Sequence, residues 1–194
     1  MSLYKFAINF LGGILKAVIG FKSSGKEHIP ENGPFLLCTN HHSNMDPVLI
    51  AVSCKRQLTF MAKEELFKVP VLGALITKLG AFPLQRGRGD VAAVKAAFSI
   101  LKEGNVLLMF PQGKRIKDGT RGKLKTGVAV IAHKMQVPVV PICISGEYKF
   151  RHKITVSCGK PIYFEEYYGQ KLDEDSTNIL AEKVYDGIFE LQQQ

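Results

Sequence analysis

The most informative stretch of the 194-residue chain is residues 35–47, which read FLLCTNHHSNMDP. The short, mostly apolar run Phe35–Thr39 predicts a buried strand. The pair Asp46–Pro47 is typical of a helix start, because Asp suits an N-cap and Pro suits the first helical position. A strand, a polar loop over Asn40–Asp46 and a helix in this order indicate one unit of an α/β fold.

The same alternation of short apolar runs and helical patterns continues along the chain. We expect strands near Phe35–Thr39, Leu58–Ala62, Ala81–Leu84, Val106–Phe110, Val139–Ile144 and Ile154–Ser157. We expect helices near Pro47–Cys54, Val71–Leu79, Asp90–Lys102, Thr126–Met135 and Thr177–Leu191. The sequence thus predicts a single α/β domain, with a central, largely parallel mixed sheet flanked by helices. Loops at the carboxyl ends of the strands line the ligand site of such a sheet, which draws attention to Asn40–Asp46 and Pro111–Arg115.

The composition describes a well-cored globular chain with an excess of positive charge. It is 46% apolar with a formal net charge of +9, which excludes disordered and collagen-like classes. Eight of the 17 acidic but only two of the 26 basic residues follow residue 164, so residues 1–164 hold 24 basic and 9 acidic groups. This excess attracts a polyanion: nucleic acid, an anionic membrane or a phosphorylated small molecule.

The four cysteines lie in or beside apolar runs and never form a C-x-x-C pair. We therefore expect buried, reduced thiols in a reducing compartment, and neither a zinc ribbon nor a redox dithiol. No secretory signal is indicated, because only Lys5 could form its positive region and no small-residue cleavage site follows.

Residues 3–21 form the most apolar stretch and predict an amphipathic helix. Its longest uncharged run, Phe6–Leu15, is shorter than the roughly 20 residues that span a bilayer. We expect residues 1–20 to form a helix that lies in a membrane interface, followed by the α/β domain over residues 21–194. The alternative is an ordinary helix docked on the core. The side chains expected in lipid include Phe6, Phe10, Ile14 and Phe21.

The loop Asn40–Asp46 places an imidazole and a carboxylate five residues apart. On a regular helix these side chains would point about 140° apart, so His41 can meet Asp46 only if His41 lies in the preceding turn. A carboxylate that accepts the Nδ1 hydrogen leaves Nε2 of the ring free as a general base. The alternative is that Asp46 merely caps a helix and that His41 and His42 are polar loop residues.

Four blocks of sequence carry a more specific signal. The blocks are Asn40–Asp46, Gly80–Arg86, Phe110–Arg115 and Val137–Ile142. In the order and spacing of these blocks, the chain resembles the glycerolipid acyltransferase family, in particular the 1-acyl-sn-glycerol-3-phosphate (lysophosphatidic acid) acyltransferases. The resemblance covers roughly residues 20 to 165.

The resemblance implies transfer of an acyl group from an acyl-CoA or acyl-carrier-protein thioester to the hydroxyl of a lysophosphatidate. By that analogy His41 is the general base, Asp46 orients it, and Arg86 and Arg115 hold the phosphate. Lys63 or backbone amides could supply the oxyanion donor. Neither a metal nor a bound cofactor is expected. Further expected substrate-binding residues are Asn40, Ser43, Gln112, Gly113 and Lys114.

Two residues of the third block depart from the family pattern Phe-Pro-Glu-Gly-Thr-Arg. Gln112 replaces the Glu and Lys114 replaces the Thr, a net change of two positive units. This change favours an anionic acceptor but leaves two interpretations open: a different acceptor head group, or drift at a variable loop.

The expected partners are a lysophospholipid, an acyl thioester and the anionic membrane surface, with an acyl-carrier protein as one candidate acyl donor. The basic segment Lys114–Lys125 suits anionic lipid or CoA phosphates. It has no aromatic residue to stack a base, so nucleic acid is not expected. We expect a peripheral or monotopic protein at the cytoplasmic face of the cell membrane. The alternatives are an acyltransferase for another lysolipid or amphiphilic alcohol, and a non-catalytic binder of anionic lipid or nucleic acid.

Overall fold

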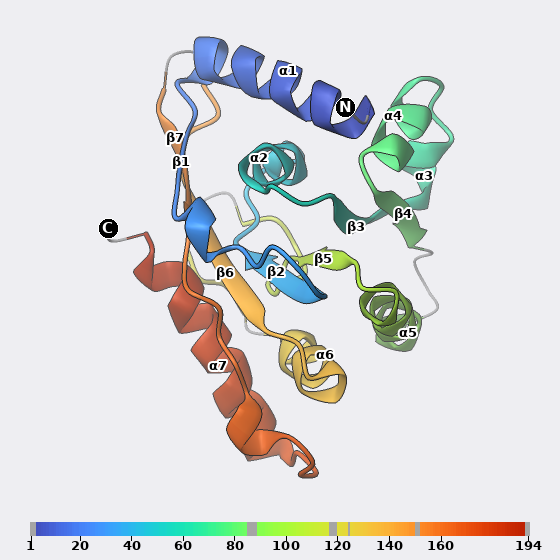
Figure 1. Ribbon diagram of the computed structural model, residues 1–194, viewed down its shortest axis with the longest axis vertical. Coiled ribbons are helices and arrows are strands. Elements are labelled where there is room, and N and C mark those ends of the chain that lie inside the picture. The colour runs from blue at the N-terminus through green and yellow to red at the C-terminus, as the bar shows by residue number, and fades with distance from the viewer. Residues whose placement is uncertain (1–2, 85–88, 117–119, 124, 150–151, 193–194) are drawn as a thin grey trace.

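The computed structural model describes residues 3–84, 89–116, 120–123, 125–149 and 152–192, and it places a central sheet between two layers of helices (Figure 1). The sheet has seven strands in the order β1-β7-β6-β2-β5-β3-β4. The strands are β1 (Lys22–Ser24), β2 (Phe35–Thr39), β3 (Leu58–Lys63), β4 (Ala81–Leu84), β5 (Val106–Met109), β6 (Val139–Gly146) and β7 (Ile154–Cys158).

The middle of the sheet is parallel and fully buried. Leu37 of β2 lies in register between Leu108 of β5 and Val140 of β6, and all five β2 residues are buried. Both faces of β2 carry core side chains, which explains why its sequence is continuously apolar rather than alternating. β6 and β7 pair in antiparallel orientation, so the sheet is mixed, as predicted.

Helices cover the two faces of the sheet and enclose two separate cores. Side chains of α1, α2 and the α4 region pack in one core, whereas those of α5, α6 and α7 pack in the other. The helices are α1 (Leu3–Ile19), α2 (Asp46–Ser53), α3 (Glu64–Phe67), α4 (Leu72–Lys78), α5 (Gly89–Lys102), α6 (Gly127–Met135) and α7 (Glu174–Glu190), with short 3₁₀ turns η1 (Lys26–His28) and η2 (Glu165–Tyr167).

The predicted strands and helices are confirmed: β2 and β4 have the predicted ends, and the ends of the others shift by at most three residues. The prediction that Asp46 is the N-cap of α2 is wrong. Met45 occupies the N-cap, and Asp46 is the first helical residue. The Asp46 side chain does not cap the helix but points back toward the preceding loop. The short elements β1 and α3 were not expected, because three or four residues carry too little periodicity to recognise.

Helix α1 packs on the core along one side and exposes apolar side chains on another, and its expected place in a membrane interface stays a prediction. Ile8 and Leu15 lie in the core, and Gly12 approaches α2 so closely that a Cβ there would lie 2.9 Å from Val52 Cγ1. On another side of the helix, Phe10 is 62% exposed and Ile14 is also exposed. Among the described residues, no helix has both the length and the apolar character needed to cross a bilayer.

Phe21 differs from the expectation that it lies in lipid. It follows the end of α1 and is buried in the core between the sheet and the helices. The side chain of Phe6 lies outside the described part of the structure.

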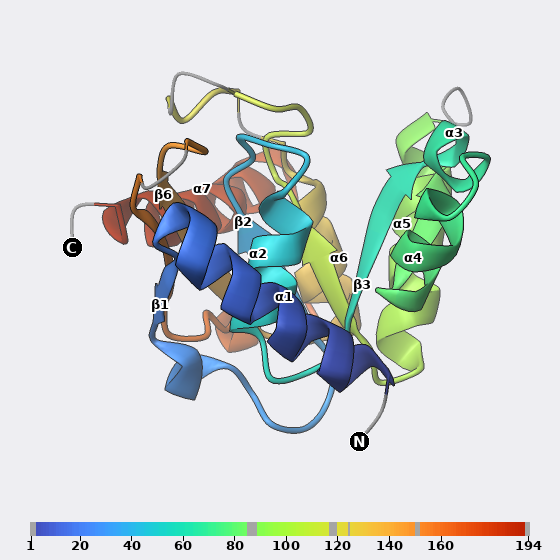
Figure 2. The ribbon, with the colours of Figure 1, turned by 90° about the horizontal axis from the view of Figure 1, so that it is seen from above.

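The carboxyl ends of the parallel strands bring distant segments together at one edge of the sheet. The loops that follow β2, β5 and β6 gather at the edge drawn uppermost in Figure 2. Two of these loops contain the first and third sequence blocks, so the fold brings the expected site residues to the same edge.

Candidate active site

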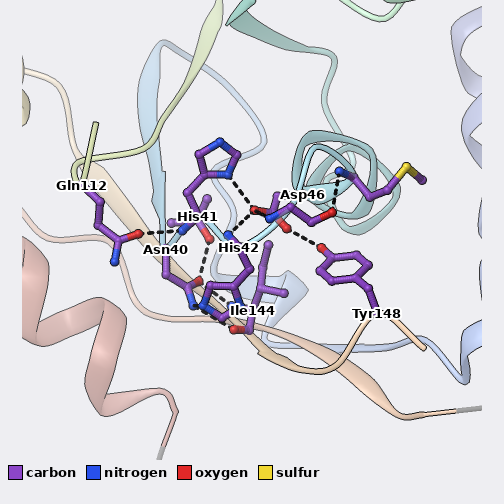
Figure 3. Close-up of polar contacts among 10 residues, drawn as sticks. Asn40, His41, His42, Asp46, Gln112, Ile144 and Tyr148 are labelled. Atoms are coloured by element: carbon purple, nitrogen blue, oxygen red, sulfur yellow. Dashed lines mark hydrogen bonds and ion pairs between the residues drawn. The ribbon is translucent and has the colours of Figure 1, made fainter. Parts of the chain in front are cut away.

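The imidazole of His41 and the carboxylate of Asp46 meet in the loop between β2 and α2 (Figure 3). The His41 Nδ1 atom lies 2.7 Å from Asp46 Oδ2. His41 precedes the helix and Asp46 begins it, so the loop turns the two side chains toward each other. His41 therefore lies in the turn before the helix, as the five-residue spacing requires if it is to meet Asp46.

Both carboxylate oxygens of Asp46 accept hydrogen bonds, although the side chain is completely buried. Its Oδ2 also accepts the backbone N–H groups of His42 at 2.7 Å and Ser43 at 2.9 Å. Its Oδ1 accepts the hydroxyl of Tyr148 from the loop after β6. Four donors thus surround a carboxylate that burial would otherwise destabilise, and they fix its orientation.

Tyr148 is held in its neutral, donating form. Its burial, and then the negative charge of Asp46, raises the pKa of this phenol well above the ordinary value of 10.0. An ionised phenolate beside the Asp46 carboxylate would place two negative charges in one buried site. Tyr148 therefore remains a hydrogen-bond donor to Asp46 throughout the physiological pH range.

Asn40 joins the end of β2 to β6. Its Oδ1 accepts the Ile144 N–H at 2.8 Å, and its Nδ2 donates to the Ile144 carbonyl at 2.8 Å. Nδ2 also lies 3.0 Å from His42 Nε2, so this nitrogen accepts when His42 is neutral. Asn40 is 1% exposed, and its side chain continues the ladder between the two strands where the backbone of β2 ends.

The third block holds His41 from its other side. The rings of His41 and Phe110 stack with centroids 3.9 Å apart. The His41 carbonyl accepts the Ile116 N–H at 2.8 Å, and the His41 N–H donates to Gln112 Oε1 at 2.8 Å. The backbone and the ring of His41 are therefore fixed by residues about 70 positions away in the sequence.

Gln112 is a buried connector between two loops. While its Oε1 accepts from His41, its Nε2 donates to the carbonyls of Thr120 at 3.2 Å and Arg121 at 3.0 Å. These partners require an amide, because a carboxylate would face two carbonyl oxygens without a hydrogen to share. The Gln that departs from the family pattern thus matches its surroundings in this chain.

The loop after β5 is also tied to the far helix layer. The Arg121 guanidinium reaches α7, where it lies 2.7 Å from Asp186 and 3.2 Å from Glu182. The three side chains are about half exposed, so these ion pairs contribute little stability on their own. These ion pairs do fix the position of Arg121, and so of this part of the loop, against α7.

The arrangement leaves one nitrogen of His41 available for chemistry. Because Nδ1 faces the Asp46 carboxylate, Nδ1 carries the hydrogen and Nε2 carries the lone pair of the neutral ring. Among the described residues, nothing forms a hydrogen bond with Nε2, and the His41 side chain is 19% exposed. A partly exposed imidazole with an oriented, unoccupied Nε2 can accept a proton from a hydroxyl group.

The other expected site residues occupy different positions around the pair. Ser43 contributes its N–H to Asp46, and its Oγ accepts the Met45 N–H. Lys63 ends β3 at the same edge of the sheet and is exposed. Arg86 lies outside the described residues. The third-block residues Gly113, Lys114 and Arg115 are exposed on the loop after β5.

Tyr148 is the part of the site that the sequence analysis missed. It lies 102 residues from Asp46 and belongs to none of the four blocks. The available signal was topological: β6 lies beside β2 in parallel orientation, so the loop after β6 emerges at the same edge as His41.

Comparisons with known proteins agree with this geometry. Residues 20–145 match the family described as Acyltransferase. The chain is 30% identical over 171 residues to the 1-acyl-sn-glycerol-3-phosphate acyltransferase of Bacillus subtilis, covering 85% of each protein. It is 32% identical over 176 residues to the chloroplastic 1-acyl-sn-glycerol-3-phosphate acyltransferase BAT2 of Brassica napus, covering 82% of this chain but only 49% of that relative.

A solved structure supports the fold as well. The crystal structure of the 1-acyl-sn-glycerophosphate (LPA) acyltransferase PlsC from Thermotoga maritima superimposes with a TM-score of 0.74 at 28% identity. The match covers 98% of this chain and 82% of that protein.

Proposed function

Because the chain belongs to the acyltransferase family, we propose that it moves a fatty acyl group from an acyl-CoA or acyl-carrier-protein thioester to the free hydroxyl of 1-acyl-glycerol-3-phosphate. The product is phosphatidate. The observation that carries the proposal is the 2.7 Å contact between His41 Nδ1 and the buried carboxylate of Asp46, which leaves Nε2 as the basic atom.

In the proposed reaction, Nε2 of His41 removes the proton from the acceptor hydroxyl as its oxygen attacks the thioester carbonyl. A new C–O bond forms, and the carbonyl oxygen carries the negative charge of the tetrahedral intermediate. When the C–S bond breaks, the imidazolium returns the proton to the departing thiolate. The Asp46 carboxylate stabilises the imidazolium, while its four donors keep it in place.

The basic residues of the third block are proposed to bind the acceptor phosphate. Arg115 offers a planar guanidinium that can donate two hydrogen bonds to one phosphate, and Lys114 adds a second positive charge. Both are exposed on the loop whose inner residue, Gln112, is bonded to His41. Arg86 joins this phosphate clamp by resemblance to the family alone.

Two features remain to complete the proposed site. The oxyanion of the tetrahedral intermediate needs a donor, for which Lys63 at the end of β3 or a backbone amide is a candidate. The exposed apolar side chains of α1, including Phe10 and Ile14, are proposed to rest in the interface of an anionic membrane at its cytoplasmic face. Lys5 and Lys16, both exposed on this helix, would meet the lipid headgroups.

Product analysis tests the proposal directly. The protein is incubated with a radiolabelled acyl-CoA or acyl-carrier protein and, separately, with lysophosphatidate, lysophosphatidylcholine and a long-chain alcohol. We expect labelled phosphatidate as the main product. Transfer to the zwitterionic or uncharged acceptor, with lysophosphatidate ignored, would assign the chain to a different acceptor. No transfer from either donor would contradict the proposed reaction.

A further inference from the structure

Large apolar side chains that are exposed to solvent concentrate on one side of the molecule. Of the twelve in the described part of the chain, eight belong to α1, the loop before α2, or α3, α4 and the turn between them. These helices cover the same face of the sheet (Figures 1 and 2). The eight residues are Phe10, Ile14, Val18, Met45, Leu66, Val69, Val71 and Leu75.

The turn between α3 and α4 holds the most exposed of these side chains. Val71 is 82% exposed, and its backbone adopts φ 64° and ψ −50°. This conformation is strained for a β-branched residue, because its Cβ crowds the backbone. A valine that is both strained and exposed is not explained by packing within the chain, which points to a contact outside the chain.

The side of the molecule that carries α1 and the α3–α4 turn also differs in charge from the side that carries α7. Helix α1 carries Lys5 and Lys16 without an acidic residue. The α3–α4 segment has a smaller excess: Lys63, Lys68 and Lys78 face two acidic residues of α3, and Lys68 lies 3.7 Å from one of them, Glu64. On the opposite face, α7 contains five acidic residues and one lysine within Glu174–Glu190. An anionic surface therefore attracts the side that carries α1 and the α3–α4 turn and repels the side that carries α7.

We propose that the α3–α4 turn is a second contact with an anionic bilayer, separate from α1. Val69, Val71 and Leu75 enter the interfacial region, while Lys68 remains at the phosphate level. Two separate contacts fix the orientation of the protein on the membrane plane. With α1 as the single contact, the protein could rotate about the axis of that helix. The exposed Met45 precedes Asp46 at the start of α2, the helix that packs against α1.

This inference rests on the proposed lipid acceptor, because a membrane-embedded substrate is what the second contact would help to reach. Its occupant is a bilayer rather than a protein: the apolar residues are spread over a helix, a loop and a turn, and basic residues accompany them. Apolar residues distributed in this way suit the broad, deformable surface of a bilayer better than the defined surface of a protein partner.

Binding to vesicles of phosphatidylglycerol and phosphatidylcholine in equal parts tests the inference on the full chain. Val71→Asp should weaken binding tenfold or more, because a valine side chain leaves the interface and a charge enters it. Ile179→Asp is the matched control: Ile179 is 57% exposed on α7, and its replacement should leave binding within twofold of the unchanged protein.

A second variant separates membrane contact from folding. Val71→Gly removes the backbone strain, so it should raise the melting temperature while it still weakens vesicle binding several-fold. Equal binding of the unchanged protein, Val71→Asp and Val71→Gly would overturn the inference, as would an equal loss in Ile179→Asp.

Turnover of a short-chain, monomeric lysophosphatidate distinguishes this inference from the proposed function. The Val71 variants should acylate that acceptor at the rate of the unchanged protein. If they do so and bind vesicles normally, the second contact is wrong and the reaction stands. If the unchanged protein acylates neither this acceptor nor its long-chain form, the proposed function fails, whatever the vesicles show.

Discussion

The loop before α2 and the loop after β5 both lie in the part of the chain that matches the acyltransferase family, yet they differ in how their polar groups are bonded. In the first loop, Asn40 and Asp46 are buried and form several hydrogen bonds each. In the second, Gln112 points inward to His41, whereas Lys114 and Arg115 are exposed. Within one short block, Gln112 is therefore bonded inside the site, whereas Lys114 and Arg115 are open to solvent.

This difference predicts that the two loops respond to mutation in different ways. Changes at the buried hydrogen bonds should alter the rate of the chemical step or the stability of the loop. Changes at the exposed cations should alter substrate affinity.

The largest effect is expected for His41→Ala. Loss of the general base should lower kcat for phosphatidate formation by about 10²- to 10⁴-fold. The fold should survive, because Asp46 keeps its bonds to the His42 and Ser43 amides and to Tyr148. His152→Ala is the matched control, since His152 lies exposed in the loop between β6 and β7. Undiminished turnover in the folded His41 variant would remove the basis for a catalytic role.

The exposed part of the second loop should behave differently. Arg115→Ala should raise KM for lysophosphatidate about tenfold or more, because a charge-assisted bond to the phosphate is lost. The value of kcat should change little, as Arg115 is not part of the His41–Asp46 network. Steady-state kinetics check this, with Lys134→Ala on α6 as the control for a lost exposed cation. A fall in kcat at constant KM would place Arg115 in the chemical step instead.

Gln112→Glu tests the hydrogen bonds of Gln112, the residue of the second loop that contacts His41 in the first. The new carboxylate would face the Thr120 and Arg121 carbonyls, so we expect the free energy of unfolding to fall by about 1–3 kcal/mol near neutral pH. The repulsion raises the pKa of the new carboxyl above its unfolded value. The deficit should therefore shrink on acidification, when the protonated acid regains a donor.

Melting curves of Gln112→Glu across an acidic to neutral pH series provide the measurement. A deficit of the same size at every pH would show that the amide hydrogens of Gln112 do not hold Thr120 and Arg121 in place.

Tyr148→Phe should have the smallest effect at neutral pH. Asp46 keeps three of its four donors, so turnover should fall only a few-fold and stability by about 1 kcal/mol. The pH dependence is more specific. Because the folded-state pKa of Tyr148 is raised above 10.0, its stabilisation is complete below about pH 10 and declines above that value, where the unfolded chain ionises.

The melting temperature of the unchanged protein should therefore fall more steeply above pH 10 than that of Tyr148→Phe. Parallel alkaline declines of the two proteins would contradict the buried position of this phenol.

The fold was predictable because its signals are local. The uninterrupted apolar run of β2 and the Asp-Pro pair at the start of α2 specify a strand, a loop and a helix without knowledge of any distant contact. The pairing of His41 with Asp46 was also predictable, since five residues and a turn suffice to bring them together.

The remainder of the site depends on contacts between residues far apart in the sequence. The stacking of Phe110 on His41, the amide bonds of Gln112 and the hydroxyl of Tyr148 all arise because β5 and β6 flank β2 in the sheet. The sequence pattern within a loop does not indicate which residues of other loops will contact it. Strand order, which determines them, follows from the packing of the whole domain.

The tautomer of His41 is the most direct test of the central claim that Asp46 leaves Nε2 as the basic atom. Nitrogen-15 NMR of the ring in its neutral form distinguishes a protonated from an unprotonated nitrogen. The account predicts hydrogen on Nδ1 and a lone pair on Nε2 in the unchanged protein, with this preference weakened in Asp46→Asn. A neutral ring that carries its hydrogen on Nε2 in the unchanged protein would contradict the account.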